Sequence, residues 1–170
     1  MRGAQAESYN YNLATTILVG TCAVTASDSA VTLPDVDRDT LSSGTLQQLH
    51  PLTISVRSCV GVGGVGAHPV LRVSGTTVAP EKSGDYLFND GGTNSTAEGY
   101  GIVVSKLNET AWNPANLVKN GDTLTLPNIN TDNTVYVAVG CGDAAACSSN
   151  NAPHAPGSIS AGITFAFLYQ

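Results

Sequence analysis

Side chains that could bind a metal ion are few and widely spaced in this sequence. The chain has three histidines: His50, His68 and His154. None belongs to an HxH or HxxxH pair, which would place two imidazoles on one face of a strand or helix. Alternating aspartates at positions 35 to 39 could in principle bind calcium, but the glycine and closing glutamate of an EF-hand loop are missing. We therefore expect no metal site, and a solvated loop at these aspartates.

Groups for covalent or acid–base catalysis are equally sparse. The sequence has no Gly-x-Ser-x-Gly elbow, and no serine or cysteine stands beside a candidate base. The glycine-rich run from Gly61 to Gly66 lacks the lysine and the following helix of a phosphate-binding loop. Trp112 could stack on a sugar ring, but no evident polar cluster surrounds it, which favours a packing role. These residues indicate a protein that is not an enzyme and needs no cofactor.

The composition and net charge of the chain argue against some classes of binding partner. Of the 170 residues 12% are charged, and the formal net charge is −6. This balance argues against nucleic acid or an anionic membrane as a partner, because phosphate binding needs a clustered basic face. No run approaches the roughly twenty apolar residues that a membrane helix needs. A chain of this length without an internal repeat is expected to form one domain.

The sequence pattern indicates that strands are the main elements of this chain and position its side chains. Short runs of valine, threonine and isoleucine are separated by turn signals such as Asn120-Gly121. A helix at Ala111–Val118 is limited to one turn by Pro114. The pattern predicts an all-β sandwich. Its expected strands are Leu13–Thr25, Ala30–Val36, Leu52–Cys59, Val70–Ser74, Gly101–Leu107, Thr123–Leu126, Thr134–Val139 and Ser160–Tyr169.

The last of these strands carries the strongest signal. Ile163, Phe165, Phe167 and Tyr169 recur at every second position, which is the period of a strand. Nothing follows Gln170 in this sequence, so we expect no later segment to pair along the far edge of the strand. An unpaired apolar edge promotes aggregation unless it is covered. We therefore expect another chain to cover it.

The N-terminal segment shows a similar alternation. Tyr9, Tyr11 and Leu13 fall on one face of an extended segment ahead of the first cysteine. Residues 1–6 end in an Ala-x-Ala pattern without a preceding apolar stretch, which is interpreted as a cloning remnant or the end of a secretory signal. An ordinary disordered terminus fits residues 1–6 about as well.

Several motifs together resemble the subunits of chaperone–usher pili. Those subunits end in an alternating apolar strand with a penultimate aromatic residue, here Tyr169, and a glycine fourteen places from the end, here Gly157. The order of the upstream segments is also similar to that of the family. These segments are Ile17–Val24, Val31–Val36, Leu52–Cys59 and Ala97–Val104.

The resemblance implies an incomplete immunoglobulin-like β-sandwich that lacks its last strand and is completed by donor-strand complementation. Residues 7–15 would be the donor extension, with Tyr9, Tyr11 and Leu13 entering a neighbouring subunit, and residues 16–170 the pilin domain. The last strand would line the open groove. The residues expected there are Gly157, Ile163, Phe165, Phe167 and Tyr169.

The same resemblance implies the partners and the location. A periplasmic chaperone would fill the groove during export, an outer-membrane usher would assemble the subunits, and neighbouring subunits would replace the chaperone. The product would be a structural subunit of an extracellular pilus on a Gram-negative cell and would contribute to surface adhesion. The sequence does not say whether it binds a host receptor.

Four cysteines allow three pairings, and we favour Cys22 with Cys59 and Cys141 with Cys147. The family resemblance supplies the first bridge only, and the second departs from its commonest pattern. Reduced thiols are the alternative.

Two further alternatives stay open. Residues 9–13 could simply begin the domain's own first strand. The protein could also be a secreted adhesin domain that binds a carbohydrate or receptor with a complete sandwich.

Overall fold

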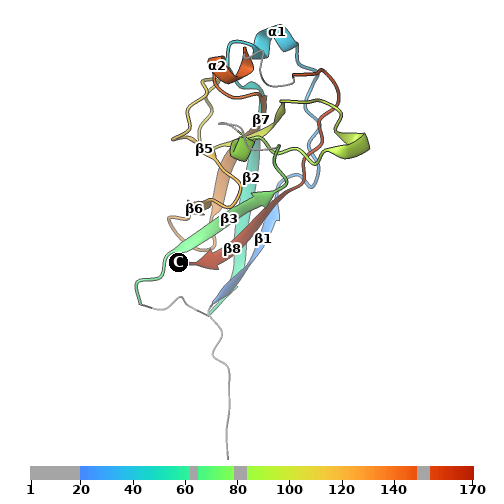
Figure 1. Cartoon of the computed structure of the whole chain (residues 1–170). Helices are drawn as coiled ribbons and strands as arrows, with labels where there is room; N and C mark the ends of the chain where they lie inside the picture. The colour runs from blue at the N-terminus through green and yellow to red at the C-terminus, as the bar shows by residue number, and fades with distance from the viewer. Residues whose placement is uncertain (1–19, 62–64, 79–83, 149–153) are drawn as a thin grey trace, which may run out of the picture.

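A computed structural model describes residues 20–61, 65–78, 84–148 and 154–170. Within them, eight strands form a five-stranded sheet in the order β1-β2-β7-β4-β5 and a three-stranded sheet in the order β6-β3-β8 (Figure 1). Every neighbouring pair of strands is antiparallel. The strands are β1 (Thr21–Ala26), β2 (Gln47–Val60), β3 (Pro69–Gly75), β4 (Gly101–Ser105), β5 (Leu117–Val118), β6 (Thr123–Thr125), β7 (Asp132–Gly140) and β8 (Ile163–Tyr169).

Short helices connect the strands. Two are α-helices, α1 (Arg38–Leu41) and α2 (Ala144–Cys147), and two are 3₁₀ turns, η1 (Gly84–Tyr86) and η2 (Gly92–Asn94). In Figure 1, α1 and α2 lie at the same end of the molecule. No helix in the described part of the chain is long and apolar enough to cross a membrane.

The core lies between the two sheets and follows the two-residue period of the strands. Leu52, Ile54 and Val56 of β2 are buried, and they belong to the same apolar cluster as Leu71 and Val73 of β3. Burial of these side chains is the main stabilising contribution to a sandwich, at about 1.5–3 kcal/mol for each large aliphatic group. The buried positions of these strands therefore match the strands predicted from the sequence.

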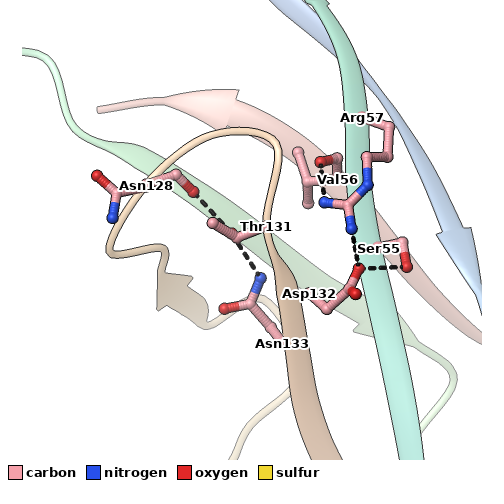
Figure 2. Close-up of polar contacts among 7 residues, drawn as sticks. All are labelled: Ser55, Val56, Arg57, Asn128, Thr131, Asp132 and Asn133. Carbon is pink, nitrogen blue, oxygen red and sulfur yellow. Dashed lines mark hydrogen bonds and ion pairs between the residues drawn. The ribbon is translucent and has the colours of Figure 1, made fainter.

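On the outer face, polar side chains link the ends of β2 and β7. An Asp132 carboxylate oxygen accepts hydrogen bonds from Ser55 Oγ at 2.6 Å and from Arg57 Nη2 at 2.8 Å (Figure 2). Thr131 Oγ1 donates to the carbonyl of Asn128 at 2.8 Å in the preceding turn. Because the Arg57–Asp132 pair is about half exposed, it contributes little stability and mainly favours the observed register.

Both disulfides have the pairing that the sequence analysis favours. Cys22 on β1 is bonded to Cys59 on β2, with Cα atoms 4.0 Å apart. Cys141, directly after β7, is bonded to Cys147 at the end of α2, with Cα atoms 5.4 Å apart. The first bond holds an edge strand to the sheet. The second closes a short loop, because its two cysteines are six positions apart in the sequence.

Two predicted elements differ from the structure. Residues 30–36 form no strand, although their burial alternates as in one, because no described segment pairs with their backbone. The possible helix at residues 111–118 is absent. Asn113 closes a turn instead, accepting from Leu117 N at 3.2 Å, and the chain then enters the short strand β5.

The arrangement is an immunoglobulin-like sandwich with one open seam. β1 and β8 are edge strands of different sheets, and they lie on the same side of the molecule (Figure 1). No described strand lies between them. The open seam is therefore the place to look for a binding site.

Candidate functional site

The edge of β8 that faces away from β3 has no strand partner among the described residues. His68 and Gln170 exchange backbone hydrogen bonds next to the β3–β8 ladder, so the even-numbered residues of β8 bond to β3. Backbone groups alternate in direction along a strand. The odd-numbered residues 163–169 therefore point their N–H and C=O groups away from β3, toward the open seam.

The free edge continues upstream of β8. Ser160 accepts from Asp90 N at 2.8 Å, and Ser158 accepts from Ala97 N at 2.9 Å, so the even-numbered residues again bond inward. No hydrogen bond joins the backbone of residues 157, 159 or 161 to another described residue. One edge with free backbone groups thus runs from residue 157 to residue 169.

The opposite side of the seam is a second unpaired edge. Ser27 N donates to Thr53 O at 2.8 Å, which is the last backbone bond between this segment and β2. Beyond it, residues 29–36 make no backbone hydrogen bond to the described residues. Pro34 lacks an N–H group and cannot donate a hydrogen bond to a ladder there. An extended segment placed in the seam could bond to both edges.

Between these two edges lies a groove with a volume of ≈ 840 Å³. Its walls come from residues 26–36 and 156–165, and its floor from the inner faces of β2, β4 and β7. Most of its side chains are apolar, whereas Asp28, Asp35 and Arg38 are the charged residues that line it. The apolar side chains that define it include Val31, Leu33, Ile102, Val137, Ile163 and Phe165.

The aromatic residues of β8 are incompletely covered. Phe165 and Phe167 pack against the main core, yet both are half-buried. Their register partners on β3, Val73 and Leu71, have an exposed fraction of 0%. The difference arises because β3 lies inside its sheet, whereas one side of β8 opens into the seam. A strand inserted there would bury the exposed apolar area.

Polar side chains rather than a ladder hold the upstream part of the β8 wall. Buried Ser95 donates to buried Asn89 and accepts from Ser160 N at 3.0 Å. An Asp90 carboxylate oxygen accepts from Gly162 N at 3.0 Å. The sequence indicated a turn at residues 89–92 but gave no sign of these bonds, which join segments about 65 residues apart. They keep the odd-numbered backbone groups aimed into the groove.

Three of the five groove residues expected from the sequence line the cavity: Gly157, Ile163 and Phe165. Phe167 and Tyr169 lie further along β8, beyond the cavity, and their rings pack edge to face with centroids 5.0 Å apart. The expected donor residues Tyr9, Tyr11 and Leu13 fall outside the described residues.

Gly157 allows its segment to lie close to the body of the domain. The structure assigns no turn at this residue. Its segment lies against residues 96–97, and a Cβ on Gly157 would lie 2.7 Å from Ala97 N. A side chain would therefore push the groove wall away from the domain, which explains why glycine fits this position.

Other candidate sites from the sequence have structural roles. Within the described residues no group of three or more histidines, cysteines or acids could hold a metal ion. Asp37 accepts from Asp39 N at 2.9 Å and caps α1. Trp112 packs against a second core cluster and lies edge-on to Tyr86, with centroids 5.8 Å apart.

Comparisons with known proteins identify the family of this chain. No curated protein sequence matches the chain. Among solved structures, the P pilus rod subunit PapA is similar with a TM-score of 0.57 and 20% identity, covering 88% of this chain and 99% of its own. A chaperone–usher pilus structure concerned with rod uncoiling matches with the same score and identity over 100% of both chains. A sequence model of the fimbrial protein family matches residues 11–170. The chain therefore belongs to the fimbrial protein family.

Proposed function

We propose that this fimbrial protein is a structural subunit of a chaperone–usher pilus and polymerises by donor-strand exchange. The observation that carries the proposal is the apolar groove between two backbone edges that lack partners among the described residues. An incoming strand would gain main-chain hydrogen bonds on both sides and would bury alternate side chains on the floor. Binding by strand addition draws its affinity and its specificity from these two sources.

The donor in this proposal is residues 7–15 of a neighbouring subunit, and residues 16–170 form the domain that receives it. Tyr9, Tyr11 and Leu13 share one face of an extended segment, which matches the alternation that the groove requires. If all three side chains are buried, each contributes roughly 1.5–3 kcal/mol before the cost of ordering the strand. The groove volume of ≈ 840 Å³ suits bulky tyrosine side chains.

An open groove also explains why a chaperone and an usher are needed. Before assembly, exposed apolar side chains beside a free strand edge would promote aggregation. A periplasmic chaperone would cover the groove during export, and the outer-membrane usher would exchange it for the next subunit. Two disulfides suit the oxidising periplasm and the outside of a Gram-negative cell. The assembled pilus would contribute to surface adhesion.

The main alternative is a binding domain with a complete sandwich. That function requires a strand of the domain itself in the groove between residues 26–36 and 156–165, and no described residue occupies this position. A structural role needs no catalytic group, and the sequence shows none of the catalytic motifs considered above.

A synthetic peptide of residues 7–15 provides the direct test. We expect it to raise the thermal unfolding midpoint of the full chain, because a ligand that binds the folded state stabilises it. A control peptide with serine in place of Tyr9, Tyr11 and Leu13 should give a much smaller shift. Equal midpoints with and without the first peptide would contradict the proposal.

A further inference from the structure

The second disulfide, which the family resemblance does not supply, lies at one end of the groove. We infer that the Cys141–Cys147 loop, residues 141–147, fixes the shape of the groove end beside α1 and so sets how tightly the last inward-facing side chain of an incoming strand is held. This inference rests on the proposed strand-accepting function and adds a positioning role for the loop.

The first observation is that Cys141 packs behind the floor of the groove. A small apolar cluster of five buried residues lies at this end: Leu41, Ala97, Tyr100, Val139 and Cys141. All of them except Cys141 line the groove directly. Cys141 is 3% exposed, so it supports the other four from behind. A displacement of Cys141 would therefore be transmitted to the side chains that an incoming strand contacts.

The second observation is that the loop also presses on α1 and the turn that follows it. Cys141 Sγ lies 3.2 Å from the carbonyl oxygen of Leu41, a contact rather than a hydrogen bond because a disulfide sulfur has no proton to donate. At Gly44, a Cβ would overlap Ala144 N and would lie 2.6 Å from the carbonyl carbon of Asp143. Backbone thus packs directly on backbone here.

The third observation concerns what holds the loop itself. Asp143 caps α2 by accepting from Ala146 N at 2.8 Å, and Cys147 N donates to Asp143 O at 2.9 Å. These bonds shape α2 internally but do not attach it to β7. The Cys141–Cys147 bond supplies that attachment, since Cys141 directly follows β7.

The consequence is a preorganised groove end. Without the bond, α2 and the loop can move away from Gly44, and Leu41 loses the backbone that supports it. An incoming strand would then have to order this end as it binds, which lowers its affinity. The other end of the seam would be unaffected, because the Cys22–Cys59 bond holds β1 there.

The test compares the full chain with its Cys141→Ala/Cys147→Ala variant, using the peptide of residues 7–15 as the probe. Alanine avoids placing a hydroxyl in the apolar cluster. We expect the variant to bind the peptide about tenfold more weakly. Truncating the terminal side chain at the α1 end, which is Leu13 for a strand antiparallel to β8, should then cost less in the variant than in the wild type. Truncating Tyr11 should cost the same in both proteins, and Ser148→Ala serves as a control with unchanged affinity.

A second measurement needs no cysteine variant, and it applies if that variant does not fold. In the wild-type chain, peptide binding should slow amide hydrogen exchange in α1 and in the loop, and a peptide truncated at its α1-end side chain should lose this protection. Unchanged exchange there, equal affinities of variant and wild type, or uniform coupling to all three side chains would overturn the inference. A wild-type chain that does not bind the peptide would instead contradict the proposed function.

Discussion

At the level of single residues, consecutive side chains of β8 lie in two different environments, the groove and the solvent. Phe165 points inward, packs on the core and lines the groove, whereas Ala166 points outward and is exposed. Both residues are held in the same antiparallel register with β3, opposite Val73 and Arg72. The pair therefore allows the groove to be tested without changing the strand that carries it.

We predict that Phe165→Asp abolishes binding of the donor peptide and of the chaperone. A carboxylate at this position would have to be buried without a partner when a strand enters, which costs several kcal/mol. The matched change Ala166→Asp should leave binding within about twofold, because surface substitutions usually have small effects. Pull-down of the co-expressed chaperone measures both variants. Normal chaperone binding by Phe165→Asp would mean that this face of β8 does not take part in assembly.

Ser95 is the second residue with a clear expected effect. We predict that Ser95→Ala destabilises the domain by about 1–3 kcal/mol, because it leaves Ser160 N without its partner and removes one of the two hydrogen bonds that Asn89 Oδ1 accepts. Hydrogen exchange at the Ser160 amide should become faster at the same time. Ser42→Ala, which removes a hydroxyl from an exposed site, should change the denaturation midpoint little. Equal midpoints for the two variants would show that the Ser95 network does not support the groove wall.

These two residues also show what a sequence can reveal at this scale. Phe165 was predictable, because its alternation with Thr164 and Ala166 is local and repeats along the strand. Ser95 was not, because its hydroxyl bonds to a backbone group that lies 65 positions away in the chain. Propensity and spacing carry no information about such a contact. Gly157 was singled out by its place in a family pattern, whereas its close approach to Ala97 needed the structure.

At the level of elements, the two disulfides should differ in their contribution to stability. The bond between Cys22 and Cys59 joins residues 37 apart, and the bond between Cys141 and Cys147 joins residues 6 apart. In the chain-entropy model their loops correspond to about 4 and about 2 kcal/mol. Removing the first pair with alanine should therefore lower the free energy of unfolding more than removing the second. Chemical denaturation of both variants checks the order, and a reversed order would contradict it.

The longer strands with a partner strand among the described residues were predictable, whereas the two-residue strand β5 was not. β2, β3, β7 and β8 fall on segments whose apolar residues alternate or run continuously, as buried strands require. The segment at residues 30–36 has the alternation too, and Val31 and Leu33 do point toward the core clusters. It nevertheless forms no strand. A ladder depends on a neighbour as well as on the segment itself, and sequence periodicity reports only the segment.

At the level of the whole molecule, the seam between β1 and β8 determines how the protein can associate. Each sheet ends in an edge strand on the same side, and the space between the edges is apolar. A monomer with an empty groove exposes half-buried aromatic residues and free backbone groups to water. Completing the sandwich with one more strand removes both defects together, so stability and assembly are linked.

Because stability and assembly are linked, we predict that a donor strand supplied within the same chain will fill the groove and prevent polymerisation. A copy of residues 7–15, joined after Gln170 through a flexible linker of about six residues, would run back along the free edge of β8. Antiparallel strands are readily connected by short loops. Tethering also gives the copy an effective concentration in the millimolar range, which favours it over a strand from another molecule.

We expect the fused protein to be a monomer in light scattering, with a higher thermal unfolding midpoint than the unfused chain. The same fusion with serine at the positions that correspond to Tyr9, Tyr11 and Leu13 should keep the lower midpoint and should still aggregate or polymerise. The serine version has the same length and can form the same backbone hydrogen bonds, so the difference measures the side chains alone. If the fused protein polymerises as the unfused chain does, its groove is not the site that the N-terminal strand fills.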